Sequence, residues 1–216
     1  MAADPVQAGE DRGERAVLTV TSTPEVAWFR APGDDAGTLN ACYNALDIHV
    51  IRGRAEEIAF TDPDGDWTFA RLLTEVAACA GVLQAFGVGV GDRVAVGFLP
   101  VPRVVIVVLA VARVGAVAVY DNSAAPDATV QVGSADGAVT FGVDDEQVPW
   151  DVAMRAGRTD PAPCADVPGD ALLLRHRDDT VSVLDALGAT DGPMPTTAGA
   201  SAVAVGGLTL WVFESE

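Results

Sequence analysis

Two arginines in the second half of the chain have a spacing that suits phosphate binding. Arg155 and Arg158 lie three residues apart beside Gly157. A guanidinium group can bind phosphate oxygens through two parallel hydrogen bonds, so a pair of them on one face could clamp an anion. Charged residues at this spacing more often form a solvated helix end. Phosphate binding is therefore a hypothesis here, and the solvated surface is the favoured alternative.

A second polar cluster contains the residue types that bind metal ions. It consists of six consecutive residues: Arg175, His176, Arg177, Asp178, Asp179 and Thr180. Imidazole and paired carboxylates are competent metal ligands. With only one histidine nearby, the pattern favours an exposed turn held by surface salt bridges. We predict no metal centre and no catalytic residue in this chain.

Other polar features have structural explanations. His49 is expected to pack half-buried on a helix, and the acidic run 144–146 is typical of a solvated loop. Gly87, Gly89 and Gly91 follow a predicted helix and precede a predicted strand. A dinucleotide fingerprint needs the reverse order, strand then helix, so these glycines predict a turn. No serine, cysteine and histidine arrangement indicates a catalytic triad.

Charge and composition exclude several classes of function. The chain has 216 residues, of which 31 are acidic and 13 basic, for a net charge of −18. Nucleic-acid binding needs clustered cations, so no nucleic-acid partner is expected. All 13 basic residues are arginine. Without a lysine, this chain cannot itself supply a Schiff base, a phosphate-loop lysine or a lysine acid.

Cysteines and apolar runs indicate a cytoplasmic protein. Cys42, Cys79 and Cys164 are odd in number and widely spaced, which predicts structural thiols in a reducing compartment. The first twenty residues contain no apolar run that resembles an export signal. The apolar run 104–112 is far shorter than the ~20 residues that span a bilayer, so no membrane span is expected.

The hydrophobic spacing predicts an α/β fold. Helices are expected from Thr38 to about residue 50, over 69–86 and up to residue 114. One further short helix is expected at 151–156. Strands are expected at 58–60, 67–69, 93–98, 116–120, 138–141, 171–174 and 208–213. Two successive strand–helix units favour a mostly parallel sheet flanked by helices.

Three regions are expected along the chain. Residues 1–23 read as a flexible lead-in, 24–187 as one domain, and 188–216 as a loose connection with a terminal strand. Trp211 and Phe213 lie on that strand. If the strand is an exposed edge, it is a natural place for self-association or for a protein partner.

An ordered series of motifs resembles a known family. It begins with Trp28-Phe29 and Leu39-Asn40-Ala41-Cys42-Tyr43-Asn44-Ala45-Leu46-Asp47. It continues through His49-Val50, Gly53-Arg54, 67–73, 80–83, Gly87-Val88, 91–95, 100–102 and 110–117. The series is similar to the N-terminal end of the short-chain acyl-CoA synthetases, the acetate- and propionate-activating members of the AMP-forming adenylate superfamily. The match covers 28–120, and it implies the first N-terminal subdomain of that fold.

A second patch resembles the lead-in to the family's phosphate-binding loop. It comprises Trp150, 159–164 and 169–174. The family then has a loop rich in Ser, Thr and Gly that ends in Pro-Lys, whereas this chain has the six residues 175–180. Large side chains prevent close backbone approach, and the carboxylates of Asp178 and Asp179 would repel a triphosphate. The resemblance therefore implies a degenerate phosphate loop.

The resemblance also bears on ligands and length. The family uses ATP, AMP and coenzyme A, none of which is expected as a cofactor here. A similar Arg-x-x-Arg stretch contacts the nucleotide end of coenzyme A in acetate-activating relatives, which suggests Arg155 and Arg158, although their position fits the lead-in after Trp150 better. The segment between Phe141 and Trp150 is short, and 36 residues follow Thr180. We expect a truncated relative without the catalytic lysine of the family's C-terminal domain.

Three functional hypotheses remain. The first is a non-catalytic family member that binds an acyl or nucleotide ligand or a protein partner. The second is one half of a split synthetase that another chain completes. The third is a folded product of a decaying gene without a selected role.

Overall fold

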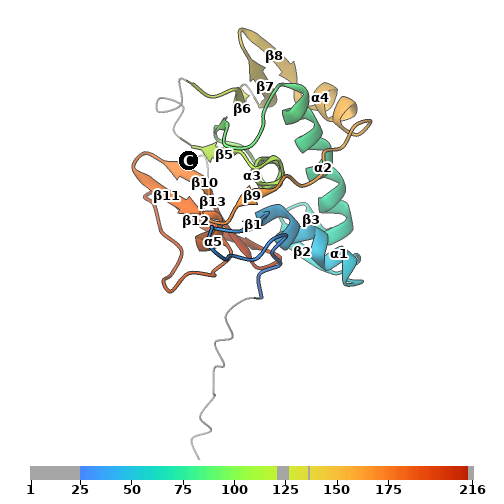
Figure 1. The fold of residues 1–216 in the computed structure, drawn as a ribbon. Helices are drawn as coiled ribbons and strands as arrows, with labels where there is room; N and C mark the ends of the chain where they lie inside the picture. The colour runs from blue at the N-terminus through green and yellow to red at the C-terminus, as the bar shows by residue number, and fades with distance from the viewer. Residues whose placement is uncertain (1–24, 121–126, 136, 214–216) are drawn as a thin grey trace, which may run out of the picture.

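A seven-stranded sheet forms the centre of the molecule. The computed structural model describes residues 25–120, 127–135 and 137–213 (Figure 1). The strand order is β11-β10-β5-β4-β6-β7-β8. Four consecutive strands of this order run parallel to one another: β10 (Leu172–His176), β5 (Val117–Val119), β4 (Arg93–Val96) and β6 (Val130–Ala135). This arrangement confirms the predicted α/β class with a mostly parallel central sheet.

Antiparallel hairpins finish both edges of this sheet. At one edge β11 (Asp179–Ser182) pairs with β10, and at the other β7 (Ala138–Val143) and β8 (Glu146–Pro149) follow β6. Strands β6, β8 and β11 were not predicted. They are short and polar along much of their length, so they lack the apolar signal of the buried strands.

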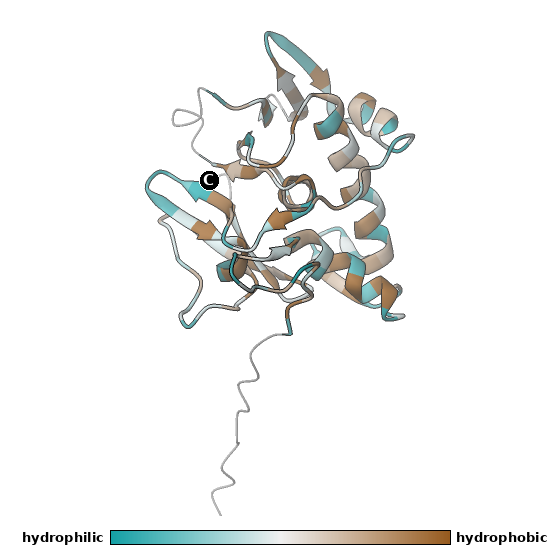
Figure 2. Cartoon of the chain, viewed as in Figure 1, coloured by the Kyte–Doolittle hydropathy of each residue, from teal (hydrophilic) through white to brown (hydrophobic). Residues whose placement is uncertain are grey.

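Two helices pack against the sheet, α3 (Arg103–Val114) and α4 (Trp150–Gly157), and a third, α2 (Phe69–Ala85), packs against both of them. Eleven residues of α3 are buried, because this helix is apolar on all sides and lies in the middle of the core. Hydrophobic residues occur along α2, as the brown segments of this helix in Figure 2 show, and nine of its residues are buried.

Two glycines permit the close crossing of α2 and α4. A Cβ atom on Gly81 would lie 2.1 Å from the carbonyl oxygen of Asp160, and one on Gly157 would lie 2.1 Å from that of Ala78. Any side chain at either position would force the backbones apart. Sequence spacing alone did not reveal this requirement.

The first predicted helix is wrong at its start. Thr38 and Leu39 form β1 (Thr38–Leu39), which pairs with β9 (Val167–Pro168). The side chain of Asn40, not that of Thr38, accepts the hydrogen bond from the backbone N–H of Tyr43. The helix then continues as a π-helix, η1 (Tyr43–Asp47), and as α1 (Ile48–Ile51). His49 on α1 is half-buried and stacks on Phe69 at 4.4 Å between ring centres, as predicted.

Two small hairpins complete the fold. The predicted hairpin is confirmed as β2 (Ile58–Asp62) with β3 (Gly65–Thr68). The terminal strand, β13 (Leu208–Phe213), pairs with β12 (Ala200–Val205), which lies in the segment expected to be a loose connection. A four-residue helix, α5 (Val183–Ala186), follows β11.

The terminal hairpin packs into the main core. Trp211 is 2 % exposed and donates its indole N–H to the carbonyl of Pro195, while Leu208, Leu210 and Val212 are buried with it. The Trp211 side chain is therefore not available on an exposed edge. The expected lead-in 1–23 lies outside the described residues. Within the described part of the chain, no helix has the length and apolar character to cross a membrane.

Candidate functional site

A tight hairpin stands where the resemblance places a phosphate loop. His176 pairs with Asp179, so Arg177 and Asp178 alone form the turn between β10 and β11. Arg177 has a φ of 55°, the left-handed conformation that two-residue hairpin turns require and that glycine or asparagine adopts more easily. The segment is therefore a β-hairpin in which a bulky residue occupies a strained turn position.

The hairpin uses its backbone groups internally. Arg175 pairs with Thr180 and Leu174 with Val181 across the two strands. A phosphate cradle needs several backbone N–H groups that converge on one anion, and ladder pairing turns them toward the neighbouring strand instead. Asp178 and Asp179 are exposed beside this turn. The residues present do not fit the phosphates of ATP.

His176 differs from the exposed position expected for it. It is buried, with its Nδ1 2.8 Å from the hydroxyl oxygen of Thr197 and its ring 4.6 Å from that of Phe213. The imidazole thus joins β10 to the terminal hairpin. Alternation along the strand explains the difference, because the residue that follows Arg175 must point to the opposite, covered face of the sheet.

The salt bridges expected in this turn are also absent from the described residues. Neither Asp178 nor Asp179 takes part in any ion pair of the described chain, and Arg175 donates its Nε–H to the carbonyl of Arg177 at 3.2 Å. The structure does not bring these carboxylates and His176 together around a common point. Asp178 and Asp179 remain solvated side chains.

Arg155 and Arg158 do not converge on an anion site either. Both are exposed at the end of α4. Arg158 Nη2 donates to Glu75 at 2.7 and 3.0 Å from the two carboxylate oxygens. This ion pair occupies the guanidinium that a phosphate would need. Arg155 forms no ion pair among the described residues and remains the one of the two that is open to an anion.

An apolar cavity of about 370 Å³ lies between α2 and α4. Its walls include Val82, Phe86, Val152 and Ala153, with Gln84 and Asp160 as polar groups. The volume falls within the range of small-molecule sites, and apolar walls with few polar groups are typical of them. No sequence motif pointed to this cavity, because the close crossing at Gly81 and Gly157 creates it.

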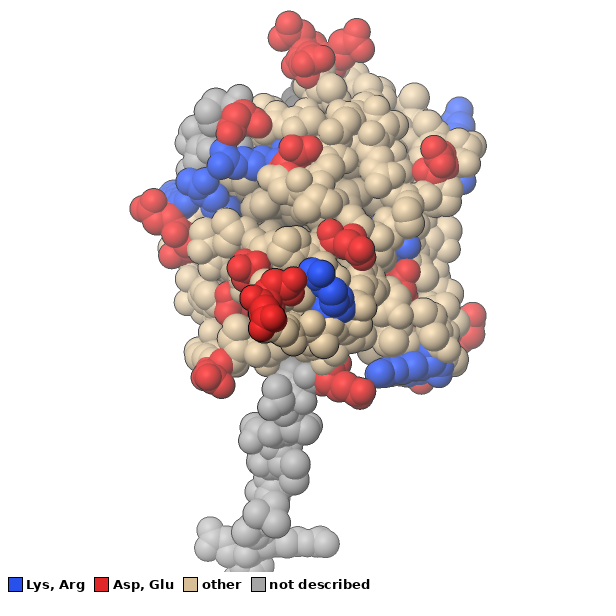
Figure 3. All heavy atoms as spheres, in the orientation of Figure 1, with Lys and Arg blue, Asp and Glu red and all other residues tan. Residues whose placement is uncertain are grey.

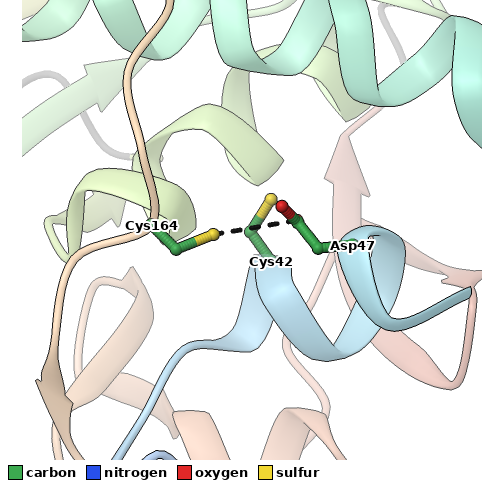
Figure 4. Close-up of side chains that lie close together, drawn as sticks. All are labelled: Cys42, Asp47 and Cys164. Atoms are coloured by element: carbon green, nitrogen blue, oxygen red, sulfur yellow. Dashed lines mark hydrogen bonds between the residues drawn. The ribbon is translucent and has the colours of Figure 1, made fainter. Parts of the chain in front are cut away.

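The most polar buried cluster was also missed from the sequence. Arg113 Nη1 donates to Asp47 Oδ2 at 2.8 Å and lies 3.7 Å from Cys42 Sγ, and its Nε donates to the carbonyl of Ala162 at 2.7 Å. The thiol of Cys164 lies 3.7 Å from the same carboxylate oxygen (Figure 4). Burial alone would lower the pKa of Arg113, but Cys42 and Asp47 raise it overall, so the guanidinium stays charged.

The π-helix creates half of this cluster. Cys42 immediately precedes η1 and Asp47 ends it, five residues apart. Hydrogen bonds from i to i+5 align residues at that spacing, whereas a regular α-helix would separate them around its axis. The hydrogen bond with Cys42 and burial raise the pKa of the Cys164 thiol. A π-turn has no hydrophobic period that a sequence reveals, so the motif Cys42-Tyr43-Asn44-Ala45-Leu46-Asp47 read as ordinary helix.

Surface charge follows the composition. Acidic side chains are spread over the face in Figure 3, with basic side chains in small groups between them. A chain with 31 acidic and 13 basic residues offers few extended cationic surfaces. The face drawn in Figure 3 therefore carries charges of both signs.

Solved structures with a similar fold define the class. An anthranilate CoA ligase, AuaEII, in complex with anthranoyl-AMP aligns with a TM-score of 0.54 and 16% identity, over 69% of this chain and 36% of that one. A benzoate CoA ligase from Burkholderia xenovorans aligns with a TM-score of 0.51 and 13% identity, over 68% of this chain and 35% of the other. The fold is thus that of the α/β lobe found in CoA ligases.

Sequence comparison gives the family. The model of the family described as AMP-binding enzyme matches residues 49–196, more than half of the chain. The chain belongs to this family. Acetyl-coenzyme A synthetase of Rhodopirellula baltica is 38% identical over 105 residues, and acetyl-coenzyme A synthetase 2 of Eremothecium gossypii is 40% identical over 100. These matches cover 44% of this chain but 15% and 14% of the relatives, so the chain aligns with about one seventh of their length.

Proposed function

We propose that this chain is a non-catalytic member of the AMP-binding enzyme family that binds a ligand or a protein partner without activating an acyl group. The observation that carries the proposal is the β10–β11 hairpin, whose turn has only Arg177 and Asp178. Its backbone groups pair across the hairpin, and its exposed carboxylates repel phosphate. The absence of lysine from all 216 residues supports the same conclusion.

The direct test is ATP–pyrophosphate exchange by the purified chain. We expect no exchange above the blank with acetate or propionate as the carboxylic acid substrate. A full-length acetyl-coenzyme A synthetase, such as that of Streptomyces coelicolor, serves as the positive control in the same assay. Acid-dependent exchange by the purified chain would overturn the proposal.

A thermal-shift screen separates the ligand from the partner role. ATP, AMP, coenzyme A, acetyl-CoA and propionyl-CoA are the probes, because a ligand that binds only the folded state raises Tm by mass action. A shift with coenzyme A or its esters that Arg155→Ala removes would place the nucleotide end of the ligand at α4. A flat response from a cooperatively melting protein would leave two hypotheses, a protein partner and a folded product without a selected role.

A split synthetase is the second candidate. The intact α/β core supports it, because a lobe with this fold retains a buried centre although the phosphate loop is replaced. The missing groups would then come from another polypeptide. Co-purification of a tagged chain with an adenylate-forming protein from its native cells, followed by exchange activity of the complex, is the expected result. Isolation of the chain alone would count against this candidate.

A further inference from the structure

We propose that Cys42, Asp47 and Cys164 form a binding site for a thiophilic divalent cation, with Zn²⁺ as the best match. The two sulfur atoms and a carboxylate oxygen all lie within 4.8 Å of one another (Figure 4). Thiolate sulfur and carboxylate oxygen are both established zinc ligands. This site is separate from the hairpin and from α4, so it does not depend on the proposed function.

The distances suit tetrahedral coordination. Zinc lies about 2.3 Å from sulfur and about 2.0–2.2 Å from carboxylate oxygen, which separates such ligands by roughly 3.5 Å. Cys164 Sγ and Asp47 Oδ2 are 3.7 Å apart. Only small side-chain movements would bring the three ligand atoms around one ion. Three protein ligands leave a fourth position for water, the arrangement of open zinc sites.

Arg113 acts as the outer partner of this site. Its Nη1 donates to Asp47 Oδ2 and lies near Cys42 Sγ, and Ala162 fixes its Nε. Outer-shell hydrogen bonds orient metal ligands and tune their basicity. Asp47 Oδ2 has a second lone pair, so it can bind the ion and still accept the hydrogen bond from Arg113.

Charge balance favours this arrangement. Without a cation, the two cysteines lie beside an Arg113–Asp47 ion pair that carries no net charge. A divalent cation displaces both thiol protons, and the three negative ligands are then balanced by the ion and by the guanidinium. Binding therefore buries no net charge, which would be costly in a poorly solvated site.

The ion also has a route from solvent. Asp47 has a side chain 17 % exposed, and Cys164 is half-buried. Partial exposure of two of the three ligands therefore gives the ion an entry path, which is one of the requirements for a metal site.

The test is Co²⁺ titration of the full chain, reduced with a phosphine and freed of metal by a chelator. We expect one Co²⁺ per chain, thiolate-to-cobalt charge-transfer absorption, and displacement by Zn²⁺. Cys42→Ser and Cys164→Ser should each remove that absorption and weaken Zn²⁺ binding by more than about 100-fold, beyond the range for loss of an outer partner. Cys79→Ser is the matched control, because Cys79 is a buried thiol of α2 outside the cluster.

Three outcomes would overturn the proposal. One is a folded protein without thiolate–cobalt absorption, and another is equal loss in the Cys79→Ser control. The third is a Cys42–Cys164 disulfide, seen as a mass lower by two hydrogens before reduction, together with no metal binding after reduction. Circular dichroism of each variant establishes that it is folded, and Cys164→Ser remains informative if Cys42→Ser fails to fold.

Discussion

The β2–β3 hairpin and the β10–β11 hairpin have the same plan but different roles. In both, two short antiparallel strands lead directly into a helix, and the last strand residue caps it: Thr68 for α2 and Ser182 for α5. The first helix has 17 residues and a buried face, whereas the second has four. The first hairpin is a separate two-stranded sheet, whereas the second forms one edge of the central sheet.

The turns of these two hairpins differ most in what their side chains do. In the first, Asp62 is buried and accepts hydrogen bonds from the N–H groups of Asp64 and Gly65 and from the indole of Trp67. In the second, Asp178 and Asp179 are exposed and contact no cation among the described residues. The same plan thus places a buried, hydrogen-bonded carboxylate beside one turn and exposed carboxylates at the other.

The largest loss of stability should come from replacing the buried Asp62. Asp62→Ala is expected to destabilise the protein by about 2–3 kcal/mol, because it removes three hydrogen bonds and leaves the Trp67 donor buried without a partner. Asp179→Ala, in the other hairpin, should change stability by less than about 0.5 kcal/mol. Urea unfolding followed by circular dichroism measures both. Asp62→Asn, which keeps an acceptor, should fall between them, and equal losses in the two hairpins would break the contrast.

Removal of a helix cap should cause the next largest loss of stability. Ser182 and Asp185 form a capping box, with the Ser182 hydroxyl accepting from the N–H of Asp185 and the Asp185 carboxylate accepting from that of Ser182. Ser182→Ala should cost about 1 kcal/mol, as for other caps. Thr68→Ala should cost a similar amount in the same urea titration. A much larger loss for Ser182→Ala than for Thr68→Ala would contradict a simple capping role for Ser182.

The strained turn predicts a stabilising change. Arg177 has a φ of 55°, a conformation that costs a residue with a side chain roughly 1 kcal/mol and costs glycine little. Arg177→Gly should therefore raise the free energy of unfolding by up to about 1 kcal/mol. Glycine also makes the unfolded chain more flexible, which offsets part of this gain. Differential scanning calorimetry should show a higher Tm. A lower Tm would indicate that the Arg177 side chain makes contacts that outweigh the strain.

The smallest effect concerns pH. Hydrogen bonds from Ser182 lower the pKa of Asp185 below its ordinary value of 3.8. A lowered folded-state pKa adds stability above the unfolded value, and this stability is lost as pH falls below it. The free energy of unfolding of the wild type should therefore exceed that of Ser182→Ala most at pH 6. This difference, measured by urea titration, should shrink as pH is lowered through about 3.8 and below. A difference that stays constant over that range would contradict the assigned hydrogen bond.

Long apolar periods made the scaffold predictable from the sequence. Helices α2 and α3 and strands β4 and β5 have continuous hydrophobic patterns, and Gly115 marks the end of α3 with a φ of 76°. The segment 200–205 was missed because alanine and serine dominate it, although its pairing with β13 makes it a strand. Pairing of this kind depends on the partner strand more than on propensity.

The candidate sites were less predictable for a different reason. Residue types at 175–180 already differ from a loop rich in Ser, Thr and Gly, but the burial of His176 depends on Thr197 and Phe213, which lie far along the chain. The cluster of Cys42, Asp47 and Cys164 needs a π-turn and a contact across 117 positions. Neither leaves a periodic pattern in a sequence, so only the fold brings these groups together.

Amide hydrogen exchange over 172–186, with and without ATP and Mg²⁺, tests directly whether 175–180 is a closed hairpin that does not bind ATP. We expect slow exchange at the paired amides of β10 and β11, as in the β2–β3 hairpin measured alongside, and no change when ATP is added. Fast exchange across 176–182 that slows on addition of ATP would contradict this prediction, because the segment would then be a flexible loop that closes on phosphate.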